Sequence, residues 1–250
     1  MRIAVLAALA LAATVIAPVA AFAEPVAVRF TEGIGRGFPV LRDASGEKIA
    51  QGDLSQIARG DRVENRLTFR FRDGSLYDET VVYSQRDVFT LLSYRLVQRG
   101  PSFPETMDAT VDRESGRFTV RYKSDDDSPE EVIKGKFEMP DDAYNGLLST
   151  LMKNLPTGTS ATVQIIAFTP KPRLVKMLLM PASSDTVMMS ETAVPSTRFL
   201  VKPQLGLFAS LLVADIPDIK IWVSGGEAPA FLRFEGPLYF MGPIWRIDWS

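Results

Sequence analysis

Hydrophobic and polar residues alternate along much of this chain, in the pattern that is typical of β-strands with one buried face. Between residues 66 and 72, three apolar side chains alternate with arginine and threonine before a turn at Asp73 and Gly74. The same alternation recurs, with polar turns between the segments, at 107–112, 117–123 and 132–138. Short connections of this kind join neighbouring antiparallel strands, so these last three segments predict a meander.

Less regular strand patterns lie on both sides of the meander. They precede it at 26–30, 37–42, 48–54, 78–83 and 88–98, and they follow it at 162–168, 174–180, 197–202, 219–223, 231–234 and 244–249. Many short strands separated by turns are typical of sandwiches and barrels. The sequence therefore predicts a mainly β protein with a single domain.

One segment has a helical pattern instead. Its apolar residues recur every three or four positions, at Tyr144, Leu147, Leu148, Leu151, Met152 and Leu155. Asp141 and Asp142 stand at the start of this segment, where carboxylates cap the N-terminal end of a helix. We therefore expect an amphipathic helix at about 140–154 whose apolar stripe covers one face of the sheet.

The first residues predict export. Arg2 precedes an apolar run at 3–20, and Ala21 and Ala23 give the small-x-small pattern of a cleavage site. Residues 1–23 are therefore expected to be a signal peptide, and 24–250 to be the mature domain, periplasmic or secreted. No later stretch has the ~20 apolar residues of a membrane-spanning helix, so no transmembrane helix is expected in the mature chain.

Composition narrows the chemistry. The 250 residues include 28 Lys and Arg, 30 Asp and Glu, and neither His nor Cys. Mechanisms built on His or Cys are excluded, as are disulfides and metal sites that need nitrogen or sulfur ligands. The net charge of −2 gives no basic surface for nucleic acid, so no such partner is expected. The sequence identifies no catalytic residue, no metal ligand and no cofactor site.

Two loops resemble binding motifs only superficially. The glycines of 33–37 are not followed by a helical pattern, which a dinucleotide-binding loop requires, so a turn is expected there. Five acidic residues could supply oxygen ligands to calcium but lack the spacing of a calcium loop. They are Asp125, Asp126, Asp127, Glu130 and Glu131. A solvated acidic turn is the expected structure.

Arginines are concentrated in the first half of the chain. They are Arg62, Arg66, Arg70, Arg72, Arg95, Arg99, Arg117 and Arg121. Where strands alternate, these residues mark the polar face of the sheet, with acidic residues interspersed. The pattern is typical of a mixed solvated face, and it also suits an anionic partner such as lipid head groups or a polyanionic envelope sugar.

Several motifs resemble those of an uncharacterised family of exported bacterial proteins. They are WVSGGEAPAF at 222–231, GPLY at 236–239, GPIWRI at 242–247, RDGSLYDET at 72–80, VQRGPSFP at 97–104 and KPRLVK at 171–176. The resemblance covers most of the mature chain and implies no activity. The layout is also similar to periplasmic half-barrels, in which a curved antiparallel sheet wraps a helix and some members carry lipids or lipoproteins. That likeness implies a half-barrel or open barrel covered by the helix.

The leading functional hypothesis is a non-enzymatic exported protein that binds a hydrophobic small molecule, a lipid or an envelope protein. Residues 205–214 form an uncharged run that suits a lid over such a ligand. Tyr144, Leu148 and Phe208 are the predicted ligand contacts. Two alternatives stay open: an outer-membrane β-barrel, whose strands alternate in the same way, and a hydrolase that uses a pair of carboxylates.

Overall fold

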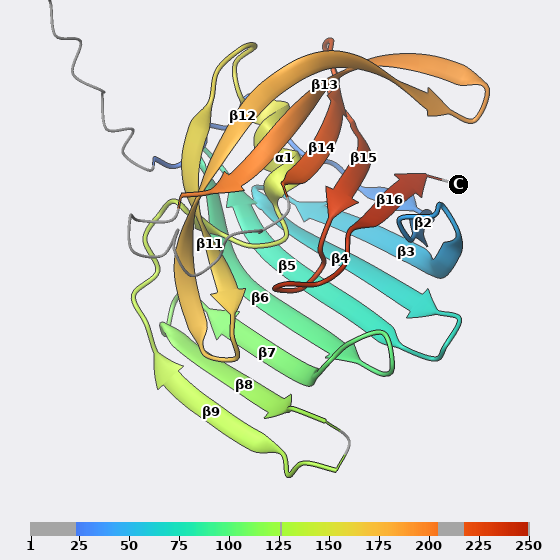
Figure 1. The fold of residues 1–250 in the computed structure, drawn as a ribbon. Helices are drawn as coiled ribbons and strands as arrows, with labels where there is room; N and C mark the ends of the chain where they lie inside the picture. The colour runs from blue at the N-terminus through green and yellow to red at the C-terminus, as the bar shows by residue number, and fades with distance from the viewer. Residues whose placement is uncertain (1–23, 126, 205–217, 250) are drawn as a thin grey trace, which may run out of the picture.

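One large sheet forms most of the molecule and bends around a short helix (Figure 1). The computed structural model describes residues 24–125, 127–204 and 218–249. The strands of the first half are β1 (Gly35–Gly37), β2 (Pro39–Arg42), β3 (Lys48–Arg59), β4 (Arg62–Phe71), β5 (Leu76–Gln85), β6 (Phe89–Arg99), β7 (Thr106–Asp112), β8 (Arg117–Lys123) and β9 (Glu131–Lys136). The second half contains β10 (Ala143–Tyr144), α1 (Leu148–Asn154), β11 (Ala161–Phe168), β12 (Pro172–Met189), β13 (Thr192–Pro203), β14 (Ile219–Ser224), β15 (Phe231–Gly236) and β16 (Trp245–Trp249).

The strand order follows the chain closely. It runs β10-β11-β12-β13-β14-β15-β16-β2-β3-β4-β5-β6-β7-β8-β9, with β1 also beside β3. Pairing is antiparallel throughout this path except between β10 and β11. β9 and β10 are its two ends, so the sheet is open. These features confirm the prediction of a mainly β protein with a curved, open antiparallel sheet.

The helix is shorter than predicted. α1 begins at Leu148, whereas the sequence pattern placed its start near 140. Gly146 has φ +63°, a left-handed conformation that interrupts a helix, and the preceding β10 pairs with β11 instead. Asp142 does not cap the helix, because its carboxylate accepts hydrogen bonds from the Gln164 side chain at 3.0 and 3.1 Å. No helix of the described residues is long and apolar enough to span a membrane.

Two strand predictions also need correction. The 26–30 segment is not a strand and contributes only an isolated bridge between Ala27 and Val88. The β12–β13 hairpin is much longer than the predicted 174–180 and 197–202. The prediction stopped short because the polar stretch around Ser183 lacks the alternation that marks a strand. The outer half of this hairpin packs through Val187 against Trp222 in a small cluster of its own.

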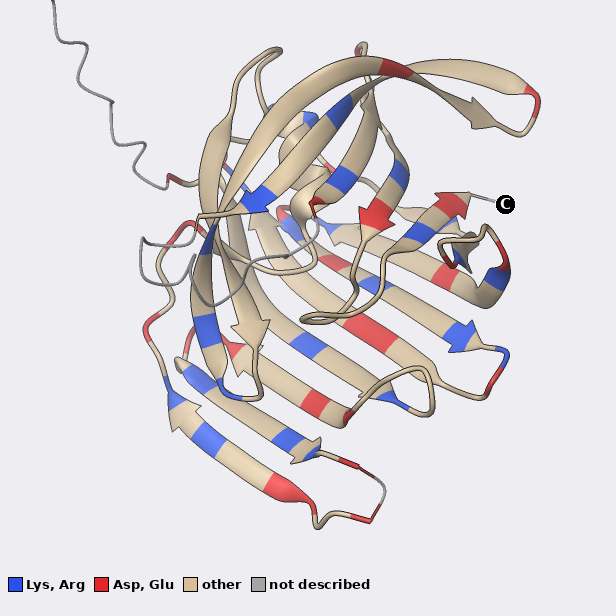
Figure 2. Cartoon of the chain, viewed as in Figure 1, with Lys and Arg blue, Asp and Glu red and all other residues tan. Residues whose placement is uncertain are grey.

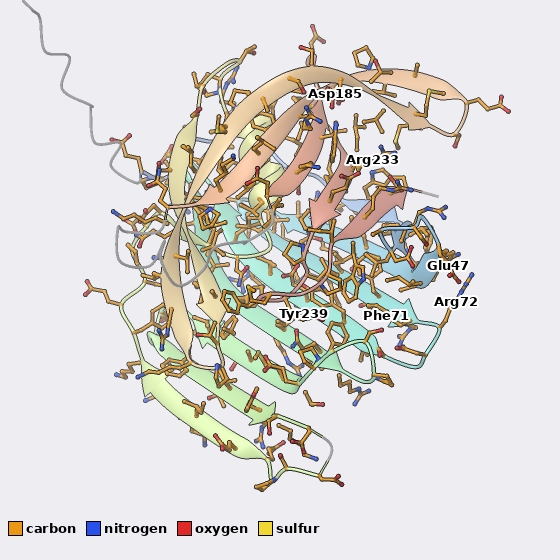
Figure 3. The ribbon with its side chains drawn as sticks, in the orientation of Figure 1. Glu47, Phe71, Arg72, Asp185, Arg233 and Tyr239 are labelled. Atoms are coloured by element: carbon orange, nitrogen blue, oxygen red, sulfur yellow. The ribbon has the colours of Figure 1, made fainter. Side chains whose placement is uncertain are left out.

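The inner face of the curved sheet carries one continuous apolar core. A cluster of aromatic rings occupies part of it, with Phe71 from β4 and Trp245 from β16 5.4 Å apart between ring centroids. Phe103, from the loop after β6, lies 5.4 Å from Phe71 and 5.6 Å from Tyr239 of the loop after β15. Figure 3 shows Phe71 and Tyr239 within the curve of the sheet. These rings therefore join the N-terminal strands to the C-terminal ones.

Tyr144 connects three parts of the chain through its hydroxyl group. The hydroxyl accepts a hydrogen bond from Val26 N at 3.0 Å and donates one to Phe89 O at 3.1 Å. Its side chain is fully buried, and the lost solvation raises the pKa of the phenol to about 12. The hydroxyl is therefore protonated at neutral pH and able to donate.

We predict that Tyr144→Phe lowers the free energy of unfolding by about 1–3 kcal/mol, because it leaves two buried backbone groups without their partner. Urea unfolding followed by tryptophan fluorescence measures the change. Tyr122→Phe, at a partly exposed tyrosine, is the matched control. Equal and small losses in the two variants would contradict this role of Tyr144.

Candidate functional site

A hollow of about 520 Å³ opens on the outer face of β3 and β4. Its lining consists of Arg36, Phe38, Gln51, Gly52, Asp53, Ser55, Arg66, Thr68 and Arg70. A second hollow, of about 310 Å³, lies over β5 to β8 and is lined partly by Thr80, Arg95, Thr110, Arg117 and Thr119. The first is larger and more densely lined by charged side chains, which makes it the better candidate for a binding site.

Strand register places the lining side chains in three neighbouring rows. Directly opposite residues in antiparallel strands point to the same face, so each row crosses from one strand to the next. The first row runs from Arg36 to Ser55 and Arg66. The second contains the Asp53–Thr68 pair, and the third contains the Gln51–Arg70 pair. The hollow thus has arginines on both sides of a row that includes Asp53.

β1 supplies one wall of the hollow and was not predicted. The glycine-rich stretch at 33–37 was expected to be a turn, but Gly35–Gly37 pairs with β3. A Cβ on Gly37 would lie 2.4 Å from the Trp249 ring, so only glycine allows this close packing. Pairing of β1 with β3 aligns Arg36 with Ser55, on the outer face.

Two of the three arginines already have acidic partners. The guanidinium of Arg36 lies 2.8 Å from Asp53, and that of Arg66 donates to both oxygens of Asp78, at 2.9 and 2.5 Å. The guanidinium of Arg70 makes no hydrogen bond or ion pair with any described residue, although its backbone is paired in the sheet. Figure 2 shows the positions of the basic and acidic residues along the sheet. The hollow therefore contains one guanidinium whose charge and donors are unused.

An aromatic ring flanks the charged groups. Phe38 is 50% exposed, and the Arg36 guanidinium lies over its ring at 5.2 Å from the centroid. The attraction between the cation and the ring helps to hold Arg36 in place. Together these residues offer an apolar surface next to hydrogen-bond donors and acceptors.

The two faces of β5 have opposite electrostatic environments. On the outer face, the hydrogen bonds from Arg66 lower the pKa of the Asp78 carboxyl. On the inner face, the adjacent Glu79 accepts hydrogen bonds from Tyr94 at 2.7 Å and Tyr77 at 3.2 Å. Burial nevertheless raises the pKa of Glu79, because desolvation of the carboxylate outweighs those two bonds. Glu79 lies within the 72–80 motif, but the sequence assigned it no functional role and counted it only among the acids interspersed on the polar face.

Two of the three predicted ligand contacts, Tyr144 and Leu148, lie in the described part of the chain. Tyr144 is fully buried with its hydroxyl bonded to backbone, and Leu148 is partly buried against the core. Phe208 lies outside the described residues. An apolar ligand at these positions stays a prediction.

The acidic turn is held by hydrogen bonds between the Asp125 carboxylate and backbone amides. Asp125 Oδ1 accepts hydrogen bonds from the amides of Asp127 at 3.1 Å and Ser128 at 2.7 Å. No group of three acidic side chains within 24–125, 127–204 and 218–249 is arranged to hold a metal ion. Asp126 lies outside those residues.

The hydrolase alternative needs two carboxylates that influence each other across a cleft. The pKa of Glu79 responds to burial and to the two tyrosines, Tyr77 and Tyr94. No second carboxyl group contributes to that shift. Glu79 is therefore a single, partly buried carboxyl group beside two phenols.

Four of the eight arginines singled out in the sequence form ion pairs with described acids. Arg66 pairs with Asp78, Arg72 with Glu47, Arg95 with Asp108 and Arg121 with Glu130. Figure 3 labels the Arg72 and Glu47 pair at the end of β4. The mixed polar face expected from the sequence is thus present. Of the residues that line the hollow, the sequence singled out only Arg66 and Arg70; Arg36, Phe38 and the polar residues of β3 were missed.

No family model and no curated protein matches this chain. Among solved structures it is similar to the crystal structure of a β-barrel-like protein of domain of unknown function DUF1849 from Brucella abortus. The two chains are 8% identical, the match covers 88% of this chain and 97% of the other, and the TM-score is 0.45. Function is therefore inferred from the geometry of this chain.

Glu79 and Asp78 should give opposite pH dependences of stability. The raised pKa of Glu79 means that the wild type loses stability relative to Glu79→Gln as pH rises from 4.5, its ordinary value, through the raised value. The lowered pKa of Asp78 means that the wild type loses its advantage over Asp78→Asn as pH falls from 3.8 through the lowered value.

Chemical denaturation of the wild type and both variants at several pH values measures these differences. Because the two residues are neighbours, each variant serves as the control for the other. If the stability difference between wild type and variant changed with pH in the same direction for both variants, the opposite pKa shifts of Glu79 and Asp78 would be wrong.

Proposed function

We propose that this protein is an exported, non-enzymatic protein that binds an anionic glycan of the cell envelope in the hollow on β3 and β4. The observation that carries the proposal is Arg70, whose guanidinium has no counter-ion among the described residues and lies beside two arginines that form ion pairs with acids. A planar guanidinium matches the geometry of a carboxylate, sulfate or phosphate group and binds it with two parallel hydrogen bonds. We therefore assign Arg70 as the contact for the anionic group of the ligand.

The rest of the hollow favours a sugar over a simple ion. Gln51, Ser55 and Thr68 present amide and hydroxyl groups that both donate and accept hydrogen bonds, which complements sugar hydroxyls. The half-exposed ring of Phe38 offers an apolar surface to the C–H face of a sugar. Asp53 supplies a further acceptor at the centre.

Arg70→Gln is predicted to weaken the binding of a sulfated disaccharide by about tenfold, because a charge-assisted, bidentate contact contributes roughly 1.5–3 kcal/mol. Isothermal titration calorimetry at low salt measures the affinity. Arg86→Gln removes the same charge at an exposed guanidinium outside the hollow, where Arg86 pairs with Asp61, and should leave the affinity unchanged. Equal affinities for wild type and Arg70→Gln would refute the proposed site.

The envelope assignment depends on the predicted signal peptide at 1–23. We expect the full-length chain, expressed in a bacterial host, to be released by osmotic shock as a protein that begins at Glu24. Fractionation with N-terminal sequencing measures this. Recovery with the membranes would instead support the outer-membrane β-barrel alternative, and retention of residues 1–23 in the cytoplasm would refute export.

An apolar ligand in the curve of the sheet is the second candidate, and Glu79 favours it. Perturbed carboxyl groups cluster at functional sites, and the ring of Phe168 stacks on Tyr94 beside the partly buried Glu79 at 5.8 Å between ring centroids. Such a ligand would present a hydrogen-bonding end to Glu79. Saturable binding of a fluorescent fatty acid that Glu79→Gln weakens and Arg70→Gln does not would support this candidate over the first.

A further inference from the structure

A second arginine cluster lies on the same outer face, on β15, β16 and β2. Arg233 Nε donates to Asp248 Oδ1 at 2.7 Å, and Arg246 Nε donates to Asp248 Oδ2 at 2.7 Å. Arg42 Nε is 3.7 Å from the same carboxylate. We propose that this cluster is an oxyanion subsite, and that it binds a second anionic group of the glycan held at Arg70; the link to that glycan rests on the proposed function.

The charges of the cluster do not cancel. Three guanidinium groups surround the single carboxylate of Asp248, so among the described residues the cluster has two more positive charges than negative ones. The nearby Glu235 is cross-strand from Arg246 but forms its ion pair with Lys220, at 3.7 Å. An added oxyanion would therefore meet a net positive site.

The arginines also retain unused donors. Arg233 and Arg246 each use Nε for Asp248, and their Nη groups form no hydrogen bond with any described residue. Their side chains are 26% and 33% exposed, so these groups are accessible without being free to swing. The donors available to a ligand are thus the terminal nitrogens of two fixed guanidinium groups.

A tryptophan holds Arg233 from the other side. The guanidinium of Arg233 lies 5.8 Å from the ring centroid of Trp222, and Trp222 Nε1 donates to Asp185 at 2.8 Å. Figure 3 labels Arg233 and Asp185 in this part of the sheet. Side chains that are already ordered lose little entropy on binding, which favours oxyanion capture.

Strand register connects this cluster to the hollow. Directly opposite residues form one row, Arg233, Asp248, Val40, Gln51 and Arg70. The row crosses four strand-to-strand steps, from β15 to β4, which is roughly 19 Å along the sheet at ~4.8 Å per step. One sugar residue cannot bridge that span, so the ligand that uses both sites is a chain with anionic groups far apart along its length.

Glycan length is therefore the decisive variable. The probes are a sulfated disaccharide and a sulfated octasaccharide of the same glucose chain, titrated into the mature protein at low and moderate salt. We expect the octasaccharide to bind about tenfold more tightly, because it adds a charge-assisted contact at the second cluster. Equal affinities for the two probes, with the disaccharide still sensitive to Arg70→Gln, would overturn the subsite and leave the proposed function intact.

Variants locate the added affinity. Arg233→Gln/Arg246→Gln is expected to reduce octasaccharide affinity to the disaccharide level and to leave disaccharide affinity unchanged. Arg86→Gln/Arg95→Gln removes the same charge from two exposed, paired guanidinium groups, at Arg86 in the turn after β5 and at Arg95 on β6, and should change neither affinity. Arg233→Lys/Arg246→Lys keeps the charge but loses the planar donors, so it should also weaken octasaccharide binding. Equal loss in the Arg86/Arg95 variant would overturn the subsite in favour of general charge attraction.

The source of the oxyanion is tested with phosphatidylglycerol vesicles. We expect no binding to vesicles under conditions in which the octasaccharide binds. Vesicle binding without octasaccharide binding would overturn both this inference and the proposed glycan ligand. The comparison of the two probes needs no variant of the second cluster, so it tests the subsite even if Arg233→Gln/Arg246→Gln fails to fold.

Discussion

Pairing between β16 and β2 is the contact on which this architecture depends. It places Trp249 opposite Pro39 and Arg246 opposite Arg42, so that β16 extends the sheet formed by the N-terminal strands. Without that pairing, β2–β9 and β10–β16 would be two separate sheets. The aromatic rings of Phe71, Phe103 and Trp245 pack across the same junction on the inner face. A long-range contact of this kind has a high loop-closure cost, which apolar packing has to offset.

The same junction organises the outer face. The hollow lies on β3 and β4 and the second arginine cluster on β15, β16 and β2, so they become neighbours only because β16 and β2 pair. The outer face is polar and its acids form ion pairs with arginines, whereas Glu79 lies partly buried on the inner face beside Tyr77 and Tyr94. As a result, the pKa of Asp78 is lowered on the outer face of β5, whereas the pKa of Glu79 is raised on its inner face.

Sequence alternation was sufficient to predict most strands and their antiparallel pairing, because each strand has one buried face; the open form of the sheet was expected only from the likeness to half-barrels. It failed where tertiary contacts override local pattern. Residues 140–147 have helical spacing, yet Gly146 is in a left-handed conformation and β10 pairs with β11. The long β12–β13 hairpin contains a polar stretch that no alternation marks. Arg70 was one of eight arginines singled out in the sequence, but only the strand register of the structure shows that Arg66 and Arg70 line the same hollow. Arg233 and Arg70 are far apart in sequence, so no local pattern relates them.

Arginine side-chain NMR tests the central claim most directly. In a titration of the 15N-labelled mature protein with the sulfated octasaccharide, the account predicts saturable shifts of the Nε–Hε signals of Arg70, Arg233 and Arg246, with Arg86 unmoved. Shifts confined to inner-face residues around Glu79 and Tyr94, or no saturable shift at Arg70, would contradict it.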